Sequence, residues 1–265
     1  MKANWKWALM CVAALALVAC DKDKKGEPQD PQDPEEETFV SKVNVKDNSI
    51  AEWDNLPSDF VFETVCPDDA AMLGLKKVKV YVDKLYINLL VEYDPETVTD
   101  FGEPGNEDNP GVPFHVYLNT DNSDETGGYA DEFADANTDI CLEGALYREG
   151  QVVVFNPAVF KWWGEVGGSG WDNWMEPGVT HDASDFWGAI VGEGQLPVAN
   201  SQCINGIFEI QIMRELIPAT WDEDEFGIGF DIQQNWSSVG VLPCASPTDD
   251  DPSGLAHKLQ VKIDK

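Results

Sequence analysis

Oxygen-bearing side chains recur at regular spacing in residues 117–129, whose sequence is Tyr-Leu-Asn-Thr-Asp-Asn-Ser-Asp-Glu-Thr-Gly-Gly-Tyr. Carboxylates and hydroxyls at every second position, followed by glycine, are typical of loops that wrap oxygen ligands around Ca²⁺. Further acidic residues follow closely and could complete the ligand shell. We therefore predict a calcium site, with an ordinary polar hairpin turn as the alternative. Its predicted ligands are Asp121, Ser123, Glu125 and Asp131.

The second feature with chemical content is a run of tryptophans in a glycine-rich stretch. Glycine-rich sequence cannot easily bury many rings as a regular strand, so some indoles should lie on a loop surface. A flat indole packs against the C–H face of a sugar ring, and neighbouring polar side chains can bond its hydroxyls. The alternative is that most rings cap the core. The predicted sugar-contact residues are Trp162, Trp163, Trp171, Trp174, Trp187, Asp172 and Asn173.

No motif for catalysis is present. The chain has no GxSxG, no HExxH and no glycine-rich phosphate loop. Its 49 acidic residues must place some pair at glycosidase spacing by chance, so their abundance is no evidence for hydrolysis. His115 falls in an alternating strand, where we expect it to be packed or exposed. We therefore predict a protein that is not an enzyme.

Haem and the remaining tryptophans carry weaker signals. Haem needs axial ligands such as histidine or methionine. Met175 and His181 are available, but nothing in their spacing singles them out, so no haem is expected. Trp53, Trp221 and Trp236 are expected to be structural, although the polar run 233–236 could form a rim.

Strands must position these residues, because the dominant hydrophobic period is two. Apolar and polar residues alternate at 77–80, 208–212, 228–232 and 259–263. Such alternation indicates strands with one face in a core and one in water. Asp83 and Lys84 predict a tight hairpin turn. Further strand candidates are 60–65, 85–93, 114–119, 139–147, 152–155 and 189–191.

Helical periodicity is nearly absent, and the best short piece is Arg214–Leu216, ended by Pro218. Residues 100–110, rich in Gly, Pro, Asn and acid, are expected to form a mobile loop. About ten short strands separated by Gly, Pro, Asn and Asp indicate an all-β fold. We predict an antiparallel, jelly-roll-like β-sandwich with long loops and little helix.

Several segments, in order, carry a resemblance to a known family. They are Ile-Ala-Glu-Trp-Asp at 50–54, the hairpin 78–91, the loop 117–129, Asp-Ile-Cys-Leu-Glu-Gly at 139–144, and the strand 208–212 with its turn. Over residues 43–265 the chain resembles the type 9 carbohydrate-binding module and its DOMON-like relatives. The resemblance implies a β-sandwich that binds sugar ends between aromatic rings and, in some members, holds calcium. The chain also resembles surface lipoproteins of glycan-using gut bacteria.

The N-terminus resembles a bacterial lipoprotein signal. Lys2 and Lys6 precede an apolar run at 8–19, which is too short to span a bilayer as a helix. The run ends in Leu-Val-Ala-Cys, a lipobox in which the Cys20 thiol takes the lipid. The alternative is a plain secretory peptide or an uncleaved anchor. We predict a signal peptide at 1–19, a disordered acidic tether at 20–39 and one β-sandwich domain at 40–265.

Charge limits the partners. The formal charge is −32, and loss of Lys2 and Lys6 with the signal leaves 15 basic against 49 acidic residues, or −34. Phosphate binding needs a basic face, so nucleic acid is excluded as a partner. The membrane should be reached only through the Cys20 lipid, and the acid-rich tether favours the outer membrane and the cell surface over the periplasmic face. Expected partners are a glycan and proteins of an outer-membrane complex.

Four cysteines remain in the predicted domain: Cys66, Cys141, Cys203 and Cys244. In an oxidising compartment they allow one or two disulfides, and three full pairings can be drawn. Cys141 lies in an apolar run, so it could equally be a buried thiol.

Together these features predict a noncatalytic outer-membrane lipoprotein that binds carbohydrate through an aromatic loop surface. The first alternative is a structural or protein-interaction surface lipoprotein without sugar binding, and the next is a glycan-active enzyme. Exposed indoles beside polar side chains would favour sugar binding, whereas fully buried tryptophans would favour the structural role.

The lipid anchor gives the first prediction. Cys20→Ser should abolish metabolic labelling with a fatty acid and release the protein from membranes, because the thiol is the attachment point. Cys11→Ser is the matched control, since Cys11 leaves with the signal, and it should label like the parent. Unchanged labelling of Cys20→Ser would contradict the lipobox.

Overall fold

The computed structural model describes residues 39–99, 101–102, 111–130, 133, 137–149, 152–155, 157–174, 177, 198–200, 206–217, 220, 223–246 and 256–265. Residues Phe39–Lys265 form one unit. Within the described residues, no helix is long and apolar enough to cross a membrane. Several predictions lie outside the described residues and stay predictions: the signal 1–19, Cys20, the tether up to residue 38, the strand 189–191, Asp131, Trp187, Cys203 and Trp221.

Segments in which apolar and polar residues alternate form strands, and the described residues contain no α-helix. β-branched and aromatic residues are frequent in these strands, because they pack well on a pleated surface. The strands are β1 (Val61–Val65), β2 (Leu75–Asp83), β3 (Tyr86–Tyr93), β4 (Val112–Asn119), β5 (Ile140–Glu149), β6 (Val152–Phe155), β7 (Ala158–Lys161), β8 (Val198–Asn200), β9 (Ile207–Met213), β10 (Glu225–Gln234), β11 (Ser237–Leu242) and β12 (Leu259–Asp264). Short 3-10 helices are η1 (Ala51–Asn55), η2 (Ser58–Phe60), η3 (Trp171–Trp174) and η5 (Arg214–Leu216).

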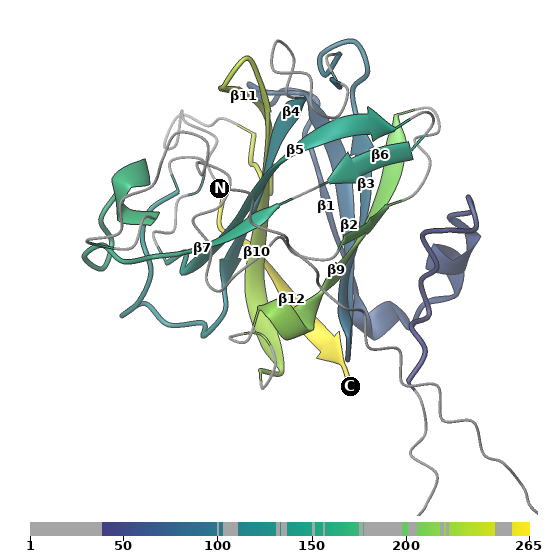
Figure 1. Ribbon diagram of the computed structural model, residues 1–265, viewed down its shortest axis with the longest axis horizontal. Helices are drawn as coiled ribbons and strands as arrows, with labels where there is room; N and C mark the ends of the chain where they lie inside the picture. The colour runs from purple at the N-terminus through teal and green to yellow at the C-terminus, as the bar shows by residue number, and fades with distance from the viewer. Residues whose placement is uncertain are drawn as a thin grey trace, which may run out of the picture. The chain divides into compact units, whose positions relative to one another are not determined.

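The strands pair into one twelve-stranded sheet that folds over into two layers (Figure 1). Layer A has the order β1-β2-β3-β9-β8. Layer B has the order β6-β5-β4-β10, with β7 also paired to β5 and β11 to β10. β12 joins the layers, because it pairs antiparallel with β10 and parallel with β2. The predicted all-β sandwich is confirmed, and the parallel β12–β2 pair makes the sheet a mixed one.

The main core is formed by the alternating apolar side chains of both layers. On β10, Phe226, Ile228, Phe230 and Ile232 are all fully buried in it, and β2, β3, β4 and β9 contribute in the same way. Each such side chain stabilises the fold by roughly 1.5–3 kcal/mol on leaving water. A one-residue shift in strand pairing would move all the apolar side chains of a strand from the core to the outer face, so this alternation also fixes the register.

The outer face of layer A is covered by the N-terminal segment 43–56. Trp53 of η1 is buried there with Val43, Leu56 and Leu90. Its indole N–H donates to Glu209 Oε1 on β9 at 2.6 Å. The expectation that Trp53 is structural is confirmed.

Two predicted turns are present. The β2–β3 hairpin turns at Asp83, whose Oδ1 accepts the backbone N–H groups of Leu85 and Tyr86, both at 2.8 Å. Arg214–Leu216 is a single 3-10 turn, and the buried Arg214 guanidinium donates to the Asp83 carbonyl oxygen at 2.7 Å. The sequence does not predict β7, β8 or β11. β7 is buried at three of its four residues and so lacks alternation, and β8 has only three residues.

Cys66 and Cys244 give the second prediction, because their sulfur atoms lie 3.8 Å apart as thiols. A disulfide needs about 2.05 Å, which a small side-chain rotation would supply. We predict that oxidised glutathione converts the pair to a disulfide, itself becoming two reduced glutathiones. The bond would link residues 178 positions apart and raise the free energy of unfolding by about 2–5 kcal/mol.

Thiol counting by mass spectrometry and urea unfolding measure the two effects. Cys244→Ser should lose the oxidation-dependent gain in stability. An oxidised parent that keeps the Cys66 thiol would contradict the pairing.

Candidate ligand-binding site

Three neighbouring strands of layer B present one polar row on their outer face. On β4, β5 and β10 the even-numbered apolar residues point into the main core, so the odd-numbered residues point outward. In the register of the sheet, His115 lies opposite Glu143 on β5 and opposite Asp231 on β10. Strand pairing therefore places one imidazole between two carboxylates.

His115 is held from both sides. Its Nδ1 lies 3.2 Å from Asp231 Oδ2, its Nε2 lies 3.4 Å from Glu143 Oε1, and all three residues are buried. Burial lowers the pKa of His115, but the hydrogen bonds and charges of Asp231 and Glu143 outweigh burial and raise this pKa to about 9. At neutral pH, His115 is therefore an imidazolium that donates to both carboxylates.

Each carboxylate keeps one buried oxygen that has no hydrogen-bond partner within the described residues. These oxygens are Glu143 Oε2 and Asp231 Oδ1. The other Asp231 oxygen also accepts from the Gln233 side-chain amide at 2.8 Å. A buried acceptor left unpaired costs about 1–3 kcal/mol, and more when it is charged. A ligand with hydrogen-bond donors would therefore gain most where such an oxygen borders a pocket.

Two loops form a wall over this face of layer B, at 120–130 and 162–174. The backbone N–H of Tyr129 donates to the Gly168 carbonyl oxygen at 2.6 Å and so links the loops. The Trp162 indole packs on Gly128, where any Cβ would collide with the ring. Trp162 also meets Trp174 edge to face, with ring centroids 5.0 Å apart. These rings belong to a second buried cluster, which fixes the wall to the sheet.

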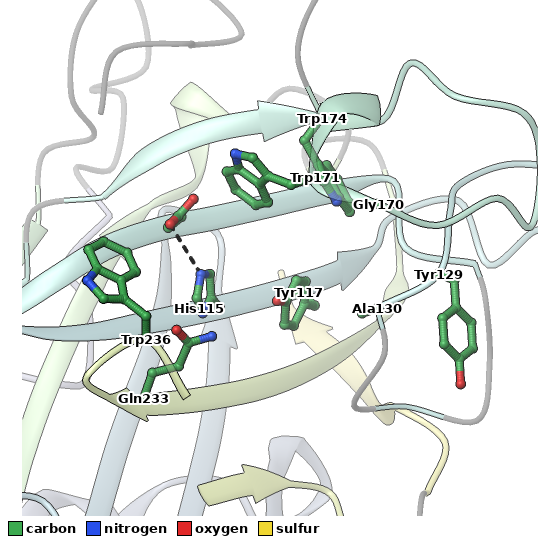
Figure 2. Close-up of a pocket in the computed structure, with 10 residues that line it drawn as sticks. His115, Tyr117, Tyr129, Ala130, Gly170, Trp171, Trp174, Gln233 and Trp236 are labelled. Carbon is green, nitrogen blue, oxygen red and sulfur yellow. Dashed lines mark ion pairs between the residues drawn. The ribbon is translucent and has the colours of Figure 1, made fainter. Parts of the chain in front are cut away.

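A pocket of about 300 Å³ opens between this wall and the polar row. Figure 2 shows Trp171 and Trp236 on either side of His115. Trp171 is half-buried and packs edge to face on Phe160 of β7, with ring centroids 5.1 Å apart. The lining residues are His115, Tyr117, Tyr129, Ala130, Glu143, Gly170, Trp171, Trp174, Gln233 and Trp236.

Trp236 comes from the tip of the β10–β11 hairpin. Asn235 and Trp236 have φ of 51° and 62°, the left-handed values that a two-residue type I′ turn needs. Asparagine tolerates this conformation, whereas tryptophan rarely adopts it. The turn leaves the indole 56% exposed at the pocket. The expectation that Trp236 is structural is therefore wrong, and a strained residue at a pocket is a reason to look for function there.

The predicted sugar-contact tryptophans separate in the structure. Trp171 and Trp174 line the pocket. Trp162 is 7% exposed, and its indole N–H donates to the Glu165 carbonyl oxygen at 3.1 Å. Trp163 is 43% exposed but lies outside the pocket lining, with Lys161 Nζ 5.3 Å from its ring.

The two polar members of the predicted set are not part of the lining. Asp172 is exposed. The Asn173 side-chain amide donates to the Ser169 carbonyl oxygen at 2.7 Å and thereby stabilises the loop. Trp187 lies outside the described residues.

The acidic loop of the predicted calcium site closes on itself. Asp121 accepts the Ser123 N–H at 3.0 Å and the Thr126 hydroxyl at 2.9 Å, and the Glu125 N–H donates to Ser123 Oγ at 3.0 Å. These are the hydrogen bonds of a polar turn. In the part of the chain that the structure describes, no three acidic, histidine or cysteine side chains gather as a metal site. Asp131 is outside that part, so the calcium site stays a prediction.

Sequence reasoning did not assign His115, Tyr117 or Glu143 to a site, and it gave Gln233 only as part of a possible rim at 233–236. The available signal was a polar residue at an outward position of an otherwise apolar strand, as in Phe-His-Val on β4 and Leu-Glu-Gly on β5. Such a residue usually faces water. Only the covering loops turn it into the floor of a pocket.

No protein-family model and no curated protein matches the chain. Among solved structures, it is similar to a family 9 carbohydrate-binding module from Caldicellulosiruptor kristjanssonii in complex with cellotriose. The identity is 11% and the TM-score 0.36, over 85% of this chain and 91% of that chain. At this distance the likeness carries no ligand over to this protein. The resemblance to DOMON-like proteins and to surface lipoproteins stays a prediction.

The pKa of His115 gives the third prediction. Because the folded-state value of about 9 lies above the ordinary 6.5, the stabilisation is complete below about pH 6.5 and is lost as the pH rises through 9. The difference in free energy of unfolding between the parent and His115→Gln should therefore shrink between pH 6 and pH 10. The expected change is on the order of 3 kcal/mol.

Urea unfolding of both proteins at both pH values measures this difference. Both proteins contain Lys258, and burial lowers the pKa of this lysine to about 8. Lys258 therefore makes the free energy of unfolding rise with pH, but it does so equally in both proteins and cancels in the comparison. A pH-independent difference would contradict a protonated His115.

Proposed function

We propose that this protein is a noncatalytic carbohydrate-binding lipoprotein and that the pocket over the β5-β4-β10 row is its sugar site. The observation that carries the proposal is the combination of indole walls with a buried acceptor oxygen. Trp171 and Trp236 flank the pocket, and Glu143, which also lines it, keeps the buried oxygen Oε2 without a described partner.

The aromatic walls suit the apolar faces of a sugar ring. A pyranose presents C–H groups above and below its plane, and an indole packs against such a face. Trp236 is largely exposed, so covering it with a ligand would remove apolar area from water. Tyr117 stacks on His115, with ring centroids 5.6 Å apart, and adds a further aromatic ring to the lining.

The floor suits the hydroxyl groups. Each sugar hydroxyl is a hydrogen-bond donor, and Glu143 Oε2 in the pocket lining is a charged acceptor in a buried setting. The ion pairs to His115 hold both carboxylates in place before a ligand arrives. Such preorganisation reduces the cost of ordering the site on binding.

The geometry argues against a catalytic role for His115. General-base catalysis needs a group that can accept a proton at the working pH. Protonated His115 has no lone pair for this, because both ring nitrogens donate to carboxylates. The noncatalytic assignment therefore forms part of the proposal.

The anchoring and location of the site are also proposed. A lipid on Cys20 and an acidic tether at 20–39 would display the domain from the outer membrane, facing the outside of the cell. There the pocket would meet glycans directly, alone or with other proteins of an outer-membrane complex.

The fourth prediction is tested with an array of neutral, acidic and amino oligosaccharides, followed by calorimetry on the tightest-binding glycan. Trp236→Ala should weaken binding by about 1–3 kcal/mol, roughly 5- to 150-fold, as expected for an aromatic hot spot. It should melt close to the parent, because an exposed indole contributes little to the core. Trp171→Ala should weaken binding similarly, with some loss of stability from its contact with Phe160.

Trp163→Ala is the matched control, since this indole is comparably exposed but outside the pocket lining. If Trp163→Ala alone weakened binding, the sugar site would be the loop surface predicted from sequence. If the parent bound no glycan, the protein-interaction alternative would take the place of this proposal.

A further inference from the structure

The pocket floor carries an excess of negative charge in either state of its histidine. Glu143 and Asp231 supply two carboxylates and His115 supplies at most one positive charge. No lysine or arginine is among the described residues that line the pocket. Among the described residues, Lys161 and Lys258 contact rings on this side of layer B, and they lie over Trp163 and Phe133, outside the lining.

A neutral ligand would leave this excess charge buried and uncompensated. Removing a carboxylate from water is costly unless a positive partner replaces the water. A hydroxyl supplies one donor and no charge, whereas a primary ammonium supplies three donors and a full positive charge. An ammonium at the Glu143 carboxylate could therefore satisfy Glu143 Oε2 and cancel the excess charge at once.

The indoles that border the pocket also favour a cationic ligand. A cation over the face of an indole is attracted by the negative face of the ring, and tryptophan is the best aromatic partner for it. Trp171 and Trp236 border the pocket on either side of His115. An acidic sugar would meet two carboxylates instead, and an N-acetylated amine would bring neither the charge nor the three donors.

We propose that this pocket selects sugars that bear a free amino group, such as 2-amino-2-deoxyhexoses, over neutral, N-acetylated and acidic sugars. The inference rests on the proposed sugar-binding function and names the ligand class of that same site. Glu143, the carboxylate in the pocket lining, would hold the ammonium, the buried Asp231 would add its negative charge through the ion pair with His115, and the indoles would hold the ring.

The test is calorimetry with the disaccharides of glucosamine, N-acetylglucosamine and glucose, all β-1,4-linked, at pH 6, where the amine is protonated. Short ligands and 0.15 M salt limit general attraction to a chain of charge −32, because the screening length is then about 8 Å. The glucosamine disaccharide should bind the parent at least 10-fold more tightly than either of the others. Glu143→Gln should remove that preference and bind the three disaccharides within about 3-fold of one another.

Glu165→Gln is the matched control, because it removes one exposed carboxylate from the same wall without touching the lining. It should keep the preference for the amine. If Glu143→Gln fails to fold, Asp231→Asn replaces it, and the comparison of the three sugars on the parent decides without either variant.

Equal binding of the three disaccharides by the parent, or equal loss of preference in Glu165→Gln, would overturn the amino-sugar inference while sugar binding itself stood. Failure of the parent to bind any of these sugars or any glycan of the array would overturn both.

Discussion

The ion pairs that join His115 to Glu143 and Asp231 are the interaction on which the site depends. Three strands of one sheet contribute one residue each, and antiparallel register alone brings them into a row. Two carboxylates side by side would be strongly unfavourable under a covering layer, and the imidazolium between them makes the arrangement tolerable. Glu143, which lines the pocket, keeps one buried oxygen without a described partner there, whereas Asp231 lies outside the lining.

The outer faces of the two layers are covered in different ways. Each must bury its outer face under loops, and each sets tryptophan near a carboxylate of that face. On layer A, the Trp53 indole N–H donates to Glu209, and the segment 43–56 is packed against the sheet. On layer B, the wall stands off from the polar row, with His115 and Trp171 ring centroids 6.5 Å apart, and a pocket remains. The strands of both layers show the same alternation of apolar and polar residues. The segments that cover the outer faces therefore decide whether a pocket remains.

The period-two pattern made the strands and the sandwich predictable. β6 coincides with the predicted range 152–155, and the Asp83 turn and the Arg214–Leu216 turn fall where the sequence indicates them. β7 could not be predicted in this way, because burial on both faces removes the alternation. The parallel pairing of β12 with β2 joins segments that lie far apart in the sequence, and no local pattern encodes it.

Only part of the site could be predicted, because the rest of it also depends on contacts between distant segments. A glycine-rich run of tryptophans does indicate a ring-bearing loop, and Trp171 and Trp174 do line the pocket. Which rings point to the sheet and which to water depends on contacts such as Trp162 on Gly128. The floor depends on register across β5, β4 and β10, and Trp236 depends on an unusual turn conformation. Such long-range contacts and turn conformations cannot be predicted from residue type and spacing.

The central claim is that a sugar enters the pocket between Trp171 and Trp236. The most direct measurement is the set of indole N–H signals in a ¹⁵N-correlated NMR spectrum, assigned by single Trp→Phe variants and followed while the tightest-binding glycan is added. The account predicts that the Trp171 and Trp236 signals shift with saturation, while that of Trp53, buried on layer A, stays in place. Shifts confined to Trp163, or no shift at either pocket indole with glycan bound, would contradict it.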